Sequence, residues 1–110
     1  MTLLPIDISV QEVEAMLGQP DVVLIDCREQ SEWDIAHIDG AILFPMSQWQ
    51  QVSGKLAEYA DKRLVVHCHH GGRSARVTQW LRENGYPSAQ NMQGGIDQWS
   101  LEVDTSVPRY

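Results

Sequence analysis

The chain has 110 residues, of which 43% are apolar and 21% charged, and its formal net charge is −7. This length suits one hydrophobic core, so we expect residues 1–110 to form a single domain. The negative charge argues against a general nucleic-acid binder, because a phosphate backbone would be repelled. No apolar run reaches membrane-spanning length, and residues 1–5 lack the pattern of a leader, which predicts a cytoplasmic protein with no membrane partner.

Short runs rich in Val and Ile alternate along the chain with segments of helical periodicity. In chain order they predict a helix from Ser9 to Gly18, a strand at 22–26, a helix starting at 31–34, a strand at 41–45, a helix from Ser47 towards Ala60, a strand at 64–68, a helix from Gly72 to Asn84, a strand at 88–92 and a last helix opened by Gly94 and Gly95. Apolar strands separated by helices are typical of parallel sheets. We expect a three-layer α/β fold with a mainly parallel sheet of four to five strands and helices on both faces.

The sequence HCHHGGRSA, residues 67–75, concentrates the chemistry of the chain. Cys68 ends a predicted strand, a turn follows, and a helix begins near Arg73; ligands bind at such strand ends in parallel sheets. Glycine in the turn lets successive N–H groups converge on one point, and the helix start adds unpaired N–H groups. These features lower the pKa of a thiol, so we interpret Cys68 as a nucleophile and the turn as an anion-binding loop. The loop comprises His69, His70, Gly71, Gly72 and Arg73. The alternative is a buried structural cysteine.

Positive charge is concentrated around this loop. Five of the eight basic residues lie between residues 61 and 82, where Asp61 is the only acid. Such a cluster favours a small anion locally, although Lys62, Arg63 and Arg82 are also typical of a solubilising helix face.

The loop resembles the active site of rhodanese-like sulfurtransferases, because Cys68 and Arg73 form C-x-x-x-x-R followed by Ser74. Three further motifs resemble that family over nearly the whole chain. They are Asp26, Arg28 and Glu32; His37 to Ala41 (HIDGA); and Gly94-Gly95 with Trp99.

The resemblance implies a ping-pong reaction. Cys68 would attack the sulfane sulfur of a donor such as thiosulfate, become a persulfide and pass the sulfur to cyanide or a thiol, including a protein thiol. Backbone N–H groups of residues 69–73 would hold the negative charge, and Arg73 would brace the loop and assist anion binding. Asp26 and Arg28 would form an ion pair or brace the loop. The resemblance implies no metal and no organic cofactor.

His69 and His70 differ from the Lys or Arg that thiosulfate-using members of the family often carry in the loop. Histidine is largely neutral at pH 7, so we expect weak thiosulfate binding and a persulfide or protein thiol as the donor.

Three other functions compete with sulfur transfer. The loop also resembles that of cysteine phosphatases and arsenate reductases, although four residues, not five, separate Cys68 from Arg73. The cluster of His and Cys suggests a metal site, but the ligand spacings typical of zinc are absent. A non-catalytic binding module is the third alternative.

The sequence also allows predictions for Cys27 and for the oligomeric state. Cys27 is interpreted as a small buried residue, with a resolving thiol near Cys68 as the alternative. We expect a monomer, because no large apolar surface stripe is evident in the sequence.

Overall fold

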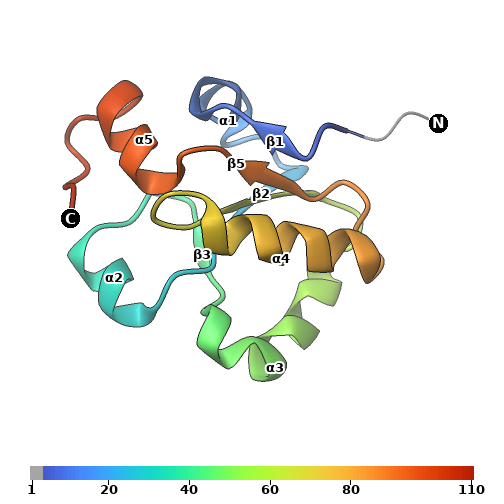
Figure 1. The fold of residues 1–110 in the computed structure, drawn as a ribbon. Helices are drawn as coiled ribbons and strands as arrows, with labels where there is room; N and C mark the ends of the chain where they lie inside the picture. Colours follow the sequence, from blue (N-terminus) through green and yellow to red (C-terminus); the bar gives the residue numbers. More distant parts are fainter. Residues whose placement is uncertain (1–3) are drawn as a thin grey trace.

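The structure is a computed structural model that describes residues 4–110; Met1 to Leu3 of the amino-terminal stretch lie outside the described residues. Five parallel strands form one sheet in the order β1-β5-β4-β2-β3 (Figure 1). The strands are β1 (Asp7–Ile8), β2 (Val22–Asp26), β3 (Ile42–Leu43), β4 (Arg63–His67) and β5 (Gln90–Met92). The predicted parallel α/β sheet is confirmed, and β4 lies at its centre.

Helices cover both faces of this sheet, with α1 and α5 on one side and α3 and α4 on the other (Figure 1). The helices are α1 (Val10–Met16), α2 (Gln30–Ile35), α3 (Trp49–Val52), α4 (Gly72–Glu83) and α5 (Gly95–Glu102), with the 3₁₀ segments η1 (Met46–Gln48) and η2 (Ser53–Tyr59). None of the helices within residues 4–110 is long and apolar enough to cross a membrane.

Side chains of β4 alternate between two apolar clusters, as the twofold period of a strand requires. Leu64 and Val66 pack in the cluster that contains Val77 and Leu81 of α4. Val65 belongs to the cluster on the opposite face, formed with α1 and α5. Burial on both faces explains why β4 is a continuous apolar run. This packing also holds in place the carboxyl end of β4, which Cys68 follows directly.

The sequence did not reveal β1. This strand has only two residues, Asp7 and Ile8, which is too short for any periodic pattern. It pairs with β5, and flanking backbone bonds from Asn91 N–H to Ile6 O (2.7 Å) and from Gln93 N–H to Ile8 O (2.9 Å) extend the pairing.

The predicted helix start at Ser47 was wrong, whereas the predicted start near Ser31 is confirmed to within one residue. The expected helix from Ser47 is divided into η1, α3 and η2. Ser47 lies inside η1, and its hydroxyl contacts the Glu29 carboxylate and does not cap a helix. Helix α2 begins at Gln30, one residue before the predicted Ser31, with Glu29 as its N-cap. Helix α1 does carry the predicted capping box of Ser9 and Glu12.

Candidate functional site

Cys68 follows β4 directly and lies at the carboxyl end of the central strand, under the turn that leads into α4. Gly71 is the N-cap of α4 and has a left-handed φ of 109°, which turns the chain back over the cysteine. Gly72 is already helical and has no positive φ. The turn therefore uses the conformational freedom of Gly71, and not that of Gly72, where an added Cβ would meet nothing within 4 Å.

Three hydrogen-bond donors converge on the Cys68 sulfur. The N–H of Gly71 lies 3.1 Å from Sγ, and the N–H and hydroxyl of Ser74 each lie 3.3 Å from it. Together with a hydrogen bond from the Cys27 thiol, which is the largest contribution, they lower the pKa of Cys68 to about 4 against the opposing effect of burial. The sulfur is thus held as a thiolate at neutral pH, the form that acts as a nucleophile.

Ser74 belongs to the sequence motif but is not among the predicted site residues. It lies in the first turn of α4, where backbone N–H groups have no helical partner and are free to face a ligand. Its hydroxyl also contacts the Asn91 side chain from β5. A small hydroxyl residue at this helix position was the only signal in the sequence.

Cys27 follows β2 and is fully buried in the same apolar cluster as Cys68. The predicted burial is therefore confirmed, and the structure also places the residue beside Cys68, as the alternative of a resolving thiol requires. The hydrogen bond with Cys68, followed by burial, raises the pKa of Cys27 far above the ordinary value for a thiol, so Cys27 remains protonated.

The imidazoles of the loop contact other aromatic rings and a carboxylate. His69 is stacked between the ring of His70 and the ring of Tyr110, with ring centroids 3.9 Å away on each side. The side chain of His70 is 67% exposed, and its Nδ1 lies 3.8 Å from a carboxylate oxygen of Asp97 in α5. Within residues 4–110, no hydrogen bond joins either imidazole to the Cys68 sulfur.

Arg73 braces the loop through a carboxylate. Its guanidinium donates to both oxygens of Glu32 in α2, at 2.6 Å and 2.8 Å. This bidentate pair, together with the Tyr110 hydroxyl, lowers the pKa of Glu32 to about 2. The positive charge of Arg73 is therefore already compensated by Glu32.

Asp26 and Arg28 form a fully buried ion pair beside the site, with 2.7 Å between Nη2 and Oδ2. Arg28 also donates to Ala36 O (2.7 Å) and to the hydroxyl of Tyr110 (2.8 Å). Tyr110 in turn donates to Glu32 at 2.6 Å, so one network connects the buried pair to Arg73. No sequence motif pointed to Tyr110.

The start of α5 holds the loop from the other side. The N–H groups of Ile96 and Asp97 donate to the carbonyl oxygens of Cys68 (2.9 Å) and His69 (3.1 Å). Gly95, with a φ of 62°, permits this approach, because a Cβ at this position would collide with both carbonyl groups. The Gly94-Gly95 motif thus positions the nucleophile's backbone.

Basic residues do not all gather at this site. Arg63 begins β4, and Arg82, near the end of α4, donates to Leu4 O and Ala89 O. Because β4 and α4 run in opposite directions across the sheet, these residues lie at the end opposite Cys68. Of the basic cluster seen in the sequence, Arg73 and Arg76 belong to the start of α4.

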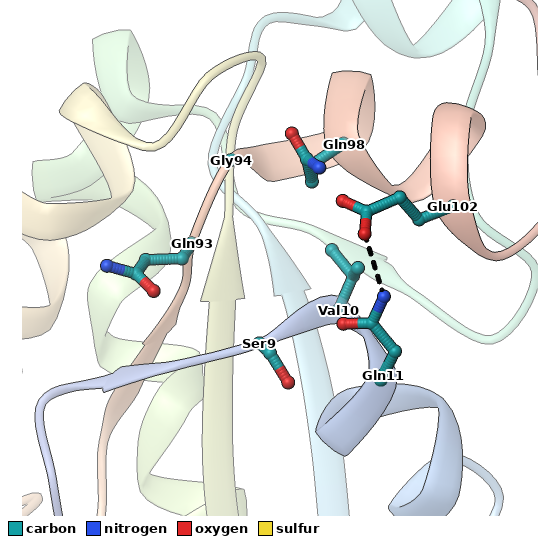
Figure 2. A pocket seen from close by; sticks show the side chains of 7 residues that line it. All are labelled: Ser9, Val10, Gln11, Gln93, Gly94, Gln98 and Glu102. Carbon is teal, nitrogen blue, oxygen red and sulfur yellow. Dashed lines mark hydrogen bonds between the residues drawn. The ribbon is translucent and has the colours of Figure 1, made fainter.

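A cavity of about 370 Å³ adjoins the site between α1 and α5. Figure 2 shows it lined by amides and by Glu102, whose carboxylate accepts a hydrogen bond of 2.9 Å from Gln11. This cavity has no cationic side chain and no nucleophile, so it does not suit an anionic sulfur donor. Among residues 4–110, no three potential metal ligands come together.

Comparison with known proteins identifies the family. Residues 9–102 match the rhodanese-like domain. The chain is 38% identical over 112 residues to the Arabidopsis thaliana "Rhodanese-like/PpiC domain-containing protein 12, chloroplastic", covering 94% of this chain and 37% of that protein. It is 32% identical over 93 residues to the tRNA uridine(34) hydroxylase of Salmonella arizonae, covering 81% of this chain and 27% of that protein. The chain thus spans well under half the length of these curated relatives.

Solved structures agree with this result. A rhodanese-related protein from Thermoplasma volcanium has a TM-score of 0.79 and 27% identity, covering 88% of this chain and 92% of that one. The human single-domain sulfurtransferase TSTD1 has a TM-score of 0.77 and 26% identity, covering 90% of this chain and 98% of that one. With its fold, its cysteine loop and a family match over most of its length, the chain belongs to the rhodanese-like domain family.

Proposed function

We propose that this protein is a sulfurtransferase that carries a sulfane sulfur on Cys68 from a small donor to a thiol or cyanide. The observation that supports this most strongly is the convergence of the Gly71 N–H and of both Ser74 donors on the Cys68 sulfur. A persulfide adds one sulfur atom and keeps one negative charge, so the same donors suit the thiolate and the loaded enzyme. In other enzymes, one such donor stabilises a developing anion in the transition state by about 3 kcal/mol.

The transfer proceeds in two displacements. The Cys68 thiolate attacks the outer sulfur of the donor, the donor's sulfur–sulfur bond breaks with its electron pair, and sulfite leaves if the donor is thiosulfate. An acceptor thiolate then attacks the outer sulfur of the Cys68 persulfide, and the Cys68 thiolate is released unchanged. No electrons are gained or lost from the protein over the full cycle, so the reaction needs no redox cofactor.

The charges around the loop favour a persulfide donor over thiosulfate. Thiosulfate carries two negative charges, but the guanidinium of Arg73 is bound to both oxygens of Glu32. His70 is the exposed histidine of the loop, so a lysine at this position would add a permanent positive charge there. We therefore expect His70→Lys to raise kcat/KM for thiosulfate more than for a low-molecular-weight persulfide; an equal effect on both would remove His70 from donor selection.

The same charge arrangement argues against phosphatase activity. A phosphoryl group on Cys68 would need cationic donors, and Arg73 is already neutralised by Glu32.

Intact mass spectrometry tests the proposal. The protein is incubated separately with thiosulfate and with a low-molecular-weight persulfide, and the chain is expected to gain one sulfur atom that cyanide then removes as thiocyanate. Cys68→Ser should gain none, while Ser106→Ala, remote from Cys68 in the carboxyl-terminal segment, serves as a matched control. Absence of sulfur gain with both donors, combined with hydrolysis of p-nitrophenyl phosphate, would overturn sulfur transfer in favour of phosphatase chemistry.

A further inference from the structure

The only two cysteines of the chain occupy matching positions on neighbouring strands. Strands β2 and β4 pair in parallel with Asp26 beside His67, and Cys27 and Cys68 are the next residue on each. The Cys27 N–H donates to His67 O at 3.1 Å, so the pairing continues as far as the cysteines. Neighbouring strands lie about 4.8 Å apart, within the Cα separation that a disulfide spans.

The two side chains also point to the same side of the sheet. Both belong to the apolar cluster beneath α4, with exposed fractions of 0% for Cys27 and 1% for Cys68. The Cys27 thiol also makes the largest contribution to the lowered pKa of Cys68, as expected for neighbouring groups. A second thiol therefore lies beside the sulfur that the sulfurtransferase reaction loads.

We propose that Cys27 is a resolving thiol that attacks the inner sulfur of the Cys68 persulfide, releasing hydrosulfide and leaving a Cys27–Cys68 disulfide. This inference rests on the proposed function, because it begins from the persulfide that sulfur transfer creates.

The step is balanced without an added oxidant. A bond forms between the two cysteine sulfurs as the bond between the inner and outer sulfur of the persulfide breaks. The electron pair of the broken bond stays with the outer sulfur, which takes the proton of the Cys27 thiol and leaves as hydrosulfide. The sulfane sulfur is reduced, and the two cysteines are oxidised.

Formation of the persulfide moves the negative charge off the Cys68 sulfur, as attack by Cys27 on that sulfur requires. In the resting enzyme, the hydrogen bond to the Cys68 thiolate keeps Cys27 protonated and unreactive. In the persulfide, the negative charge moves to the outer sulfur, towards the donors of the loop, and the inner sulfur becomes a neutral electrophile. Cys27 then faces an electrophile in place of a thiolate.

The outer sulfur of the Cys68 persulfide therefore has two outcomes, transfer to an acceptor or release as hydrosulfide. When an acceptor thiol is present, it takes the outer sulfur and the cycle closes. When acceptor is absent, Cys27 discharges the sulfur as hydrosulfide, and the disulfide blocks further loading until an external dithiol reduces it.

The decisive experiment follows one loading event without acceptor. Wild-type protein and the variants Cys27→Ala and Cys27→Ser are treated with a low-molecular-weight persulfide under nitrogen, desalted, and followed by intact mass and by sulfide release. The wild type should first gain one sulfur atom, then end two hydrogen atoms lighter than the reduced chain, with one sulfide released per chain. Both variants should retain the added sulfur and release sulfide only at background level. A wild-type persulfide as long-lived as that of the variants would overturn the inference while leaving sulfur transfer intact.

A second arm separates this step from the proposed function. Methyl methanethiosulfonate converts Cys68 directly to a methyl disulfide, without any sulfurtransferase step. Wild-type protein should lose methanethiol and form the internal disulfide, whereas Cys27→Ala should keep the methylthio group. If no donor loads sulfur but this exchange occurs, sulfur transfer and the persulfide step fail while the thiol pair remains established; if the methylthio group persists in the wild type, Cys27 is not a resolving thiol.

Discussion

Gly95→Ala tests how closely the start of α5 must approach the cysteine loop. The added Cβ would lie 2.5 Å from His69 O and closer still to Cys68 O, both of which are backbone atoms that cannot rotate away. Either α5 or the loop must move. Movement breaks the two bonds from Ile96 and Asp97 to those carbonyl groups.

The expected loss has two parts. An L-residue held at a φ of 62° costs about 1 kcal/mol, after allowance for the reduced freedom of alanine in the unfolded chain. Two backbone hydrogen bonds contribute about 1 kcal/mol each. We therefore expect Gly95→Ala to lower the free energy of unfolding by about 3 kcal/mol.

Gly85→Ala is the matched control. Gly85 has a φ of 98°, further from the left-handed minimum than that of Gly95, but a Cβ there would meet nothing within 4 Å. It should therefore lose about 1 kcal/mol, from backbone strain alone. Urea unfolding followed by tryptophan fluorescence measures both variants, and the rate of Cys68 alkylation against pH reports the site. Equal losses for the two variants, with an unchanged alkylation profile, would refute the close-approach argument.

Three further predictions concern the supports of the loop. Ser74→Ala removes the hydroxyl beside the sulfur but keeps the backbone N–H, so the pKa of Cys68 should rise while staying below that of a free thiol; an unchanged alkylation midpoint would contradict this. Glu32→Gln should reduce sulfur loading and cost about 2 kcal/mol at pH 7. Because the pKa of Glu32 falls from 4.5 to about 2 on folding, its stabilisation is complete above about pH 4.5 and is lost towards pH 2, so acid titration should bring wild type and variant together. Tyr110→Phe keeps the stack on His69 but loses the bonds to Arg28 and Glu32, and should cost about 1 kcal/mol in thermal unfolding, whereas Tyr110→Ala should cost more.

Strong local patterns predicted most of the fold. The apolar runs at β2 and β4 and the periodic face of α4 each fix an element whose burial is continuous. The glycine at the start of α4 and the strand end at Cys68 placed the loop correctly, because these depend on neighbouring residues alone. The two-residue β1 has no such pattern. It forms by pairing with β5, more than 80 residues away, and local sequence does not encode a contact at that distance.

Contacts between distant segments limited the prediction of the site. The pairing of Arg73 with Glu32 joins residues 41 positions apart, and the Tyr110 contact with Glu32 spans 78. The resemblance gave Arg73 two roles, bracing the loop and assisting anion binding, and its pairing with Glu32 favours the bracing role. The proximity of Cys27 to Cys68, which the sequence offered only as an alternative, likewise follows from the pairing of β2 with β4, two strands that are distant in the chain.

Two of the motifs outside the cysteine loop acquire one physical meaning in the structure. Asp26 and Arg28 end β2 with a buried pair that holds Tyr110; Glu32 fixes Arg73; and Gly95 lets α5 bind the carbonyl groups of the loop. Each motif therefore restrains the same backbone from a different element. Such restraint matters because the N–H groups of Gly71 and Ser74 stabilise a charged sulfur only while they point at it, and a loop with freedom to turn would lose that alignment. The Cys27 thiol and the donors that this rigid frame holds in place, more than any cationic side chain, make Cys68 an anion.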